Sequence, residues 1–299
     1  MANSNGWGDG AANNSIGWGQ GANNNIGWGK SHSLSSAGLT DIVGLTTDSD
    51  AQAFITAAAI TDATQQSAID TLVKGLKTDG IWTKMKAIYP FVGGTATTHK
   101  YNLKDPRDLD AAFRLVFNGG WTHSSTGATP NGTNGYADTK LNDSSLTPNS
   151  SHMSYYSRTN ALTSTYDMGI YNGTKGIWYA LRQAGTNSFT GGIFQAGTSG
   201  EVSVANLDST GYYVGGKNGN TTVKFYKNGT NVVSIAKADA TATNTSIYLA
   251  TLNNNGTPAF GFSTKQTAFS TIGDGLSDTE ASNLYTRVQA FQTALSRQV

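Results

Sequence analysis

The chain of 299 residues contains no cysteine, only two glutamates and five prolines, and few charges of either sign. The absence of cysteine excludes disulfides and thiolate metal sites. Charged residues make up 13% of the chain and the formal net charge is +1, so the sequence offers no basic footprint for DNA or RNA. We therefore expect a surface covered mainly by Asn, Thr, Ser and Gly.

The sequence also lacks the segments that direct a chain into or across a membrane. Its N-terminus has no cationic stretch followed by an apolar run, and no window approaches the ~20 apolar residues of a membrane span. The composition suits a protein exposed outside the cell, but the chain carries no export signal. Cell lysis would release such a protein without an export signal. This reasoning favours a virion component that is made in the host cytoplasm and released by lysis.

The residues needed for common hydrolytic mechanisms are absent or scattered. Retaining glycosidases need two carboxyl groups about 5–5.5 Å apart, whereas Glu201 stands alone on an expected strand and Glu280 is expected to cap a helix. The chain has neither a Gly-x-Ser-x-Gly elbow nor a phosphate-binding Gly-rich loop. No two histidines have the short spacing of a metal pair. We expect no enzyme, no metal site and no cofactor; the histidines are His32, His99, His123 and His152.

Short segments rich in Val, Ile, Tyr and Phe follow one another between Gly and Asn turns from about residue 150 to residue 272. No helix-length amphipathic segment lies between them, which makes a parallel α/β fold a poor interpretation. Asn228-Gly229 is the pair best able to adopt a type I′ hairpin turn. The pattern predicts a mainly β fold, an antiparallel β-sandwich. The expected strands are 166–172, 176–182, 192–195, 201–204, 211–214, 223–226, 232–235 and 246–250.

Two other segments have helical patterns. The first can be capped by Thr61 or Asp62 and ended by Gly80, and its apolar residues are Ile69, Leu72, Val73 and Leu76. The second begins with the capping box Ser277-Asp278-Thr279-Glu280, and its apolar residues are Leu284, Val288, Phe291 and Leu295. We expect one helix before the sandwich and one amphipathic helix after it. The latter either packs on its own domain, which we favour, or forms a seam between subunits.

Three segments connect the first helix to the sandwich. Residues 81–91 are dense in large apolar side chains and are expected to pack on the sandwich as a covering layer. Residues 111–117 are expected to form a strand that ends at the turn 118–120. The turn residues of 121–147 predict a long exposed loop, and a loop of that length is usually functional or mobile.

The first thirty residues contain three copies of Gly-Trp-Gly, with the tryptophans eleven and ten residues apart. Each copy has one large side chain to bury, while ordering its glycine-rich backbone costs much conformational entropy. The repeats therefore cannot form a core by themselves. One interpretation is a disordered low-complexity tail. We favour an arm, residues 1–50, that docks on neighbouring subunits or a receiving structure, because an inert linker has no need of tryptophan. The expected anchors are Trp7, Trp18, Trp28, Ile16 and Ile26.

Aromatic side chains among Asn and Asp residues are the remaining candidates for a binding surface. Such rings can stack on sugars, although many strand aromatics simply fill a core. Because neighbouring residues of a strand point to opposite faces, one tyrosine of 155–156 and one of 212–213 is expected outside. The aromatics considered are Trp121, Tyr136, Tyr155, Tyr156, Trp178 and Tyr212. Those favoured for glycan contact are Trp121, Tyr136, Tyr155 and Tyr212.

Several motifs resemble segments of structural proteins of tailed phages, including the crAss-like phages of Bacteroidota. The motifs are IWTKMKAIYPFVGG at 81–94, KDPR at 104–107, the segment 109–138 and IGDGLSDTE at 272–280. The similarity covers roughly residues 60–299. It implies a concanavalin A-like, laminin-G-like jelly roll used in virion fibres or spikes. It carries over no catalytic or ligand residue, and the arm lies outside it.

These expectations together describe a phage virion structural protein of the head or of a tail fibre or spike. Its arm docks on other virion proteins, and its sandwich domain, residues 51–299, is displayed outward and offers weak contacts to host-surface glycans. A homo-oligomer is expected, with a trimer favoured. The alternatives are a carbohydrate-active enzyme or its lectin module, and a decoration protein without a ligand.

Overall fold

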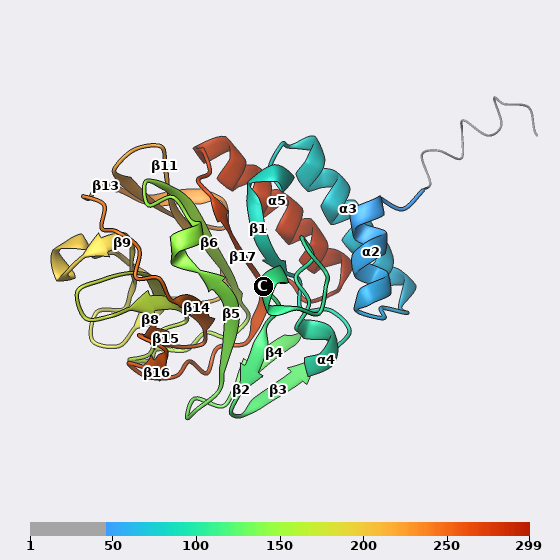
Figure 1. Ribbon diagram of the computed structural model, residues 1–299, viewed down its shortest axis with the longest axis horizontal. Coiled ribbons are helices and arrows are strands. Elements are labelled where there is room, and N and C mark those ends of the chain that lie inside the picture. The colour runs from blue at the N-terminus through green and yellow to red at the C-terminus, as the bar shows by residue number, and fades with distance from the viewer. Residues whose placement is uncertain (1–45) are drawn as a thin grey trace, which may run out of the picture. The chain divides into compact units, whose positions relative to one another are not determined.

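Two β-sheets packed face to face form most of the computed structural model, which describes residues 46–299 (Figure 1). Sheet A has the strand order β13-β12-β11-β6-β17-β4-β3, and β1 pairs with a separate part of β17. Its strands are β1 Met85–Tyr89, β3 Trp121–Ser124, β4 Gly127–Pro130, β6 Ser150–Ser157, β11 Gly211–Asn218, β12 Thr222–Lys227, β13 Thr230–Ala236 and β17 Thr267–Asp274.

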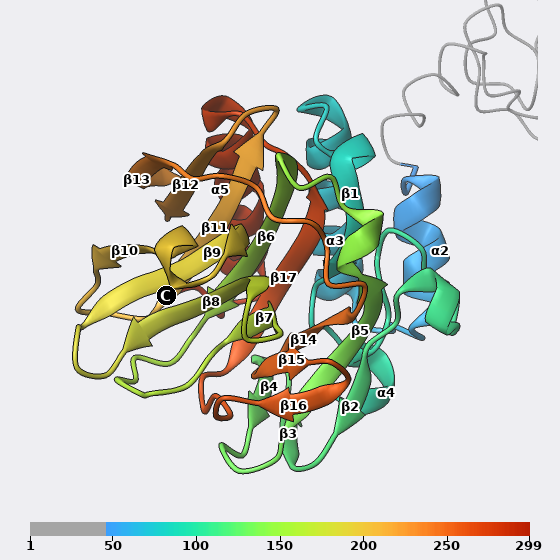
Figure 2. The ribbon, with the colours of Figure 1, turned by 60° about the vertical axis from the view of Figure 1, so that its left-hand side comes forward.

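Sheet B has the strand order β10-β9-β8-β7-β14-β5-β2, and a short hairpin, β15–β16, lies beside β7 (Figure 2). Its strands are β2 Val116–Asn118, β5 Tyr136–Asn142, β7 Met168–Tyr171, β8 Lys175–Gln183, β9 Ser188–Ala196, β10 Val202–Ala205, β14 Ser246–Leu249, β15 Leu252–Asn254 and β16 Thr257–Ala259. All its strand pairs are antiparallel except the single contact between β15 and β7. The antiparallel sandwich predicted from the sequence is therefore confirmed.

Helices cover the face of sheet A that points away from sheet B (Figure 1). They are α2 Ser49–Ala57, α3 Ala63–Thr78 and α5 Asp278–Ala294, and a one-turn helix, α4 Ala96–His99, follows β1. One hydrophobic core lies between the two sheets, and a second lies between sheet A and the helices. The domain thus has three layers, and both faces of sheet A are buried.

The burial of both faces explains the tyrosine pairs. Tyr155 and Tyr213 belong to the core between the sheets, whereas Tyr156 and Tyr212 belong to the core under the helices. The members of each pair point to opposite faces, as strand geometry requires. All four are nevertheless fully buried. The expectation that one of each pair lies outside is wrong, because α3 and α5 cover the face that an uncovered sandwich would expose.

The strands and the tight turn predicted from short-range sequence patterns are confirmed. Each of the eight strands expected from 166 to 250 is present. Asn228 and Gly229 have φ angles of 50° and 76° and join β12 to β13 in a two-residue turn, as predicted. The Asn228 side chain also accepts a hydrogen bond from the Tyr212 backbone N–H, so it fastens the turn to β11.

Both predicted helices are confirmed, and one more is present. Asp62 caps α3 by accepting from the Gln65 backbone N–H, and Ser277 and Glu280 form the expected reciprocal capping box of α5. The apolar stripe of α5 packs into the helix-covered core of its own domain, which is the arrangement we favoured. The helix α2 was not predicted; it begins at Ser49, within the segment interpreted as arm and linker.

Residues 81–147 differ most from expectation. The apolar run 81–91 is not a covering layer, because β1 pairs with β17 and is part of sheet A. A short 3₁₀ turn, η3 Asp110–Ala112, begins the expected strand 111–117, so that only β2 remains. The expected loop 121–147 instead contains β3, β4 and β5. Its Gly and Asn residues form tight turns between short strands rather than one long loop.

The buried His152 side chain closes a chain of hydrogen bonds under the helices. Its Nδ1 lies 2.6 Å from the carbonyl oxygen of Asp274, which can only accept, so Nδ1 carries the proton and donates it. Its Nε2 lies 3.0 Å from the hydroxyl of Thr271, which also contacts Ser154, and Ser154 accepts from Tyr212. A neutral ring satisfies this network, and burial lowers the pKa of His152 to about 4.

We expect the free energy of unfolding to fall by roughly 2 kcal/mol through His152 alone as the pH is lowered from about 6.5 to about 5. The pKa of His152 in the folded protein lies below the 6.5 of an exposed histidine, so the unfolded chain takes up a proton first. Stability that is present above pH 6.5 is therefore lost progressively toward pH 4. The nearby Asp274 and Glu280 oppose this shift and Lys84 reinforces it, but desolvation is the largest effect.

Urea unfolding at about pH 7 and about pH 5 measures this loss. Burial also lowers the pKa of His99, to about 3, and the pKa of His123, so the wild-type loss includes further contributions of the same sign. The variant His152→Gln is the comparison, because it removes one titrating group and leaves His99 in place. It should lose less stability between the two pH values than the wild type, even if it is less stable at neutral pH. Equal losses would contradict the prediction.

Candidate functional site

Of the four residues expected to contact glycans, the structure buries two completely and leaves two half-buried. Tyr155 and Tyr212 are fully buried in the two cores, so neither ring can meet a ligand at the surface, and their assignment as contact residues is wrong. Trp121 and Tyr136 are half-buried neighbours. The Trp121 Nε1–H donates to the carbonyl oxygens of Asn118 and Tyr136 at 3.1 and 3.2 Å, so this indole has no free donor.

The other predicted anchors, Trp7, Trp18, Trp28, Ile16 and Ile26, lie outside the described residues, as does His32. Within residues 46–299, no helix is long and apolar enough to cross a membrane. In the same part of the chain, no three His, Asp or Glu side chains gather in a way that could hold a metal ion.

The two glutamates have different partners and do not form a pair. Glu280 accepts from Lys84 and from the Ser277 backbone, whereas the pKa of Glu201, on the far side of the sandwich, is raised by partial burial.

The structure does bring His99 and His123 together, with their Nδ1 atoms 2.9 Å apart, although 24 residues separate them in sequence. The spacing rule for histidine pairs missed this contact, because it is formed by α4 and β3 meeting in the fold.

A cluster of four aromatic rings lies on the face of sheet B that points away from sheet A. Trp178 of β8 meets the ring of Tyr166 at 5.0 Å and that of Tyr171 at 6.5 Å, edge to face. Phe260, which follows β16, lies 6.2 Å from Tyr166 and 6.0 Å from Tyr171. Phe260 is 43% exposed, Tyr166 and Tyr171 are half-buried, and Trp178 lies beneath them. These four residues are called the outer aromatic cluster below.

Glycines flank Trp178 on both neighbouring strands. Trp178 is paired across the sheet with Gly169 on β7 and with Gly192 on β9. A Cβ atom on Gly169 would lie 2.5 Å from the Trp178 Cβ, and Gly169 has a φ of 138°, which disfavours other residues. A Cβ atom on Gly192 would instead collide with the Gln195 side chain. Both cross-strand partners of Trp178 are therefore positions without room for a larger residue.

The row of outward-facing residues continues beyond Trp178. Tyr248 on β14 is paired with Gly169, so it lies two strands from Trp178 on the same face. The rings of Tyr248 and Tyr136 are 4.8 Å apart. Of the residues predicted for glycan contact, Tyr136 is thus the one that the fold places on the same face as the outer aromatic cluster.

Two polar atoms beside the outer aromatic cluster have no hydrogen-bond partner within residues 46–299. They are the Trp178 Nε1–H, a donor, and the Gln195 Oε1, an acceptor. The Gln195 amide lies against Gly192, the cross-strand partner of Trp178, since a Cβ atom there would come within 1.5 Å of Oε1. Buried polar groups are nearly always paired, so unpaired ones are typical of places that accept a ligand or water. The indole N–H can donate to a ligand oxygen, and the amide oxygen can accept from a ligand hydroxyl group.

The sequence contained part of the signal for this cluster. Tyr171 and Trp178 flank the turn at 173–174, and the register of a hairpin there places both side chains on one face. Tyr166 and Phe260 were not predicted to join them. Phe260 reaches the site only because the β15–β16 hairpin packs beside β7, and no local sequence pattern predicts that contact.

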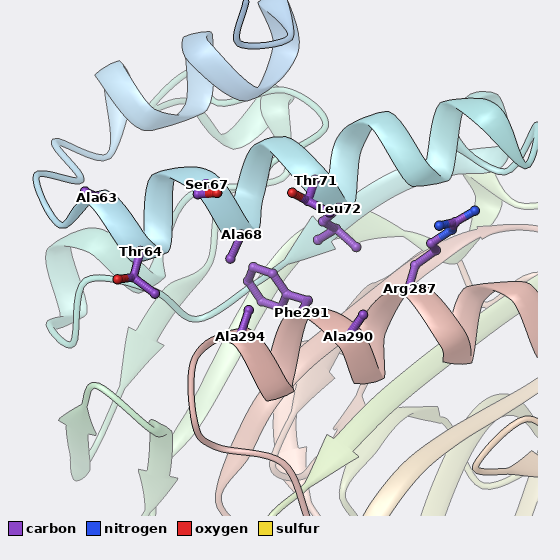
Figure 3. Close-up of a pocket in the computed structure, with 10 residues that line it drawn as sticks. All are labelled: Ala63, Thr64, Ser67, Ala68, Thr71, Leu72, Arg287, Ala290, Phe291 and Ala294. Atoms are coloured by element: carbon purple, nitrogen blue, oxygen red, sulfur yellow. The ribbon is translucent and has the colours of Figure 1, made fainter. Parts of the chain in front are cut away.

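The described residues also form a groove of about 460 Å³ between α3 and α5 (Figure 3). Small residues of both helices line it, the Phe291 side chain projects from α5 toward α3, and Arg287 lies toward one end. The Arg287 guanidinium is already paired with Asp79 at 2.8 and 2.9 Å. The lining therefore offers apolar surface but little directional chemistry, in contrast to the outer aromatic cluster.

No protein-family model matches the chain, and no curated protein is significantly similar to it. Solved structures with some similarity include domain 4 of AbnA, a GH43 extracellular arabinanase from Geobacillus stearothermophilus, in complex with arabinotriose. That match has 17% identity and a TM-score of 0.43, and it covers 67% of this chain and 98% of that chain.

Two further structures have comparable similarity. The CBM40 of the Ruminococcus gnavus IT-sialidase has 14% identity and a TM-score of 0.35, over 45% of this chain and 81% of that chain. The binding domain of botulinum neurotoxin serotype D/C VPI 5993 has 11% identity and a TM-score of 0.43, over 70% of this chain and 53% of that chain. Similarity this weak identifies no ligand and no binding residue of the present chain.

Proposed function

We propose that this protein is an adhesion component of a phage particle, displayed on its surface, and that its sandwich binds a saccharide at the outer aromatic cluster. The observation that carries the binding half of the proposal is the exposed ring of Phe260, which lies over two half-buried tyrosines on the outer face of sheet B. A cluster of aromatic side chains that reaches the surface is a candidate interaction site.

The chemistry of the cluster favours a sugar over a purely apolar ligand. Aromatic faces pack against the C–H groups of a pyranose or furanose, while hydroxyl groups need both donors and acceptors nearby. The unpaired Trp178 Nε1–H and Gln195 Oε1 supply one of each, next to the rings. Both atoms are covered in this structure, so a ligand reaches them only when the covering side chains shift.

The particle half of the proposal rests on the sequence. The three Gly-Trp-Gly repeats within residues 1–50 are the expected attachment to other virion proteins, and the resemblance to tailed-phage structural proteins covers roughly residues 60–299. In this proposal the arm holds the protein on the particle, and many copies of a weak site act together. The protein is then a ligand-binding structural component and not an enzyme.

The variant Phe260→Ala is expected to weaken saccharide binding roughly 3- to 10-fold, because it removes about 1 kcal/mol of ring packing at the surface. Phe260→Tyr keeps the ring and should bind like the wild type. Screening the full chain on a glycan array and titrating the best ligand by calorimetry would measure the three affinities. Leu109→Ala, at another exposed apolar residue, is the control for a general surface effect.

Two results would contradict the binding proposal. Either no saccharide on the array binds the wild type, or the best ligand binds Phe260→Ala as tightly as it binds the wild type and Phe260→Tyr. The first result favours a decoration protein without a ligand, and the second places the sugar elsewhere on the sandwich.

A further inference from the structure

The outermost strand of sheet A, β13, is exposed along its whole length. It pairs with β12 on one side and with no other strand of residues 46–299 on the other. Six of its seven residues are exposed, and only Val233 is half-buried. Val232 and Ile235 are 36% and 42% exposed, and they are among the large apolar side chains at the surface. Figures 1 and 2 show β13 at the margin of the ribbon.

Most of the usual protection of an edge strand is missing from β13. Its sequence, Thr-Asn-Val-Val-Ser-Ile-Ala, contains no charged residue and no proline. Natural edge strands commonly carry lysine, proline or an inward-pointing charge that prevents further pairing. One irregularity remains, since the register with β12 shifts between Phe225 and Tyr226. The outward row of backbone N–H and C=O groups is therefore a place where another strand can pair.

The chemistry of the strand and its surroundings fits a second copy of the same chain. An uncharged strand meets no like-charge repulsion when it lies antiparallel against itself, and a two-fold axis makes that contact closed. Lys224 and Lys217 are paired with Asp278 and Asp239, and Lys237, which directly follows β13, donates to the Ser199 carbonyl oxygen. β13 itself offers no counter-charge to a strongly basic or acidic partner, whereas a second copy would cover part of the exposed Val232 and Ile235 side chains.

We infer that two copies of this protein associate by antiparallel pairing of their β13 strands, so that sheet A continues from one copy into the other. Main-chain hydrogen bonds supply the affinity of such an edge contact, and the exposed apolar side chains supply its register. The inference is independent of the proposed saccharide site, which lies on the outer face of the other sheet. A dimer paired through β13 would carry two outer aromatic clusters, one on each copy.

Sedimentation equilibrium of the full chain over a wide range of concentrations tests the association. We expect the wild-type mass to rise from one chain to two. Val232→Lys and Ile235→Lys each place like charges at the contact, so both should weaken the association at least about tenfold. Both side chains are exposed, so the thermal midpoint of each variant should stay that of the wild type.

The matched control is Leu109→Lys, which introduces the same charge at a leucine that is 52% exposed and precedes η3, at the β2–β5 end of sheet B. This variant should associate like the wild type. Hydrogen exchange of the β13 amides, at low and high protein concentration, separates edge pairing from association through residues 1–50, because only edge pairing protects β13.

The inference is wrong if the β13 amides exchange equally fast at both concentrations, whatever the mass. It is also wrong if the wild type stays a single chain throughout, or if Val232→Lys and Ile235→Lys associate as strongly as Leu109→Lys.

Discussion

Replacing Arg297 by methionine is expected to lower the free energy of unfolding by about 3–5 kcal/mol, because it leaves several buried carbonyl oxygens without a donor. Arg297 follows α5, close to the end of the chain, and is 1% exposed. Its guanidinium donates to the carbonyl oxygens of Pro90 and Phe91 at 2.6 and 2.7 Å and to that of Ala268 at 3.0 Å. It also donates to the Gln292 side chain at 2.6 Å.

These acceptors come from three segments that are far apart in sequence. Pro90 and Phe91 follow β1, Ala268 is in β17 and Gln292 is in α5. Within residues 46–299, no carboxylate forms an ion pair with Arg297, so carbonyl dipoles stabilise its charge. Burial lowers the pKa of Arg297 to about 9, which still leaves it charged at neutral pH. One side chain therefore joins the final helix to sheet A.

Urea unfolding followed by circular dichroism would measure this loss. Arg297→Lys keeps a charge and three donors, so it should recover part of the stability that Arg297→Met loses. Arg107→Met is the control, because Arg107 is exposed and pairs only with its neighbour Asp105, and its midpoint should not change. A midpoint for Arg297→Met close to that of Arg107→Met would show that the carbonyl contacts do not stabilise the fold.

The second large effect is expected at Asp167, where alanine should cost about 3–5 kcal/mol by leaving a buried ammonium without its counter-charge. Asp167 and Lys265 form an ion pair at 3.2 Å, and both side chains are fully buried. The carboxylate also accepts from the Ser263 hydroxyl at 2.6 Å and from the Leu181 backbone at 2.8 Å. Lys265 donates to the Thr163 hydroxyl at 2.9 Å.

The pair lies where the two sheets meet, since Asp167 immediately precedes β7 and Lys265 precedes β17. Lys265→Met should destabilise less than Asp167→Ala, because the carboxylate keeps two other donors when the lysine is gone. The double variant Asp167→Leu with Lys265→Met leaves no isolated charge. It should be more stable than Asp167→Leu alone, because isolated buried charges cost more than well-packed apolar groups.

A double-mutant cycle of urea unfolding energies measures the coupling between these residues. The wild type, the two single variants and the double variant provide the four corners. If the effects of Asp167→Leu and Lys265→Met simply add, the residues are not coupled and the buried pair is not what stabilises this junction. Far-ultraviolet circular dichroism of each variant would show whether it retains the β-sandwich.

Local contacts explain what could be predicted. The α5 capping box, the Asp62 cap of α3 and the Asn228-Gly229 turn each depend on residues within four positions of one another. The strands from 166 to 250 were recognisable because turns punctuate short runs of β-forming residues. Charge and cysteine content also belong to this class, because composition does not depend on the fold.

Contacts between distant segments explain what was missed. Tyr155 and Tyr212 have the same local pattern as surface aromatics, and only the helices and the second sheet decide that both are buried. His99 and His123 meet because α4 and β3 meet. The run 81–91 forms a strand of sheet A because it pairs with β17, which lies nearly two hundred residues later in the sequence.

The sequence by itself determined the class of fold, the positions of the strands from 166 to 250, both long helices and the scarcity of charged residues, because these follow from neighbours along the chain. Tertiary structure alone decided which aromatics reach the surface. Phe260 joins Tyr166, Tyr171 and Trp178 across up to 94 residues of sequence, from Tyr166 to Phe260. A side chain's exposure depends on what packs over it, and in a sandwich that covering layer comes from segments that are remote in the chain.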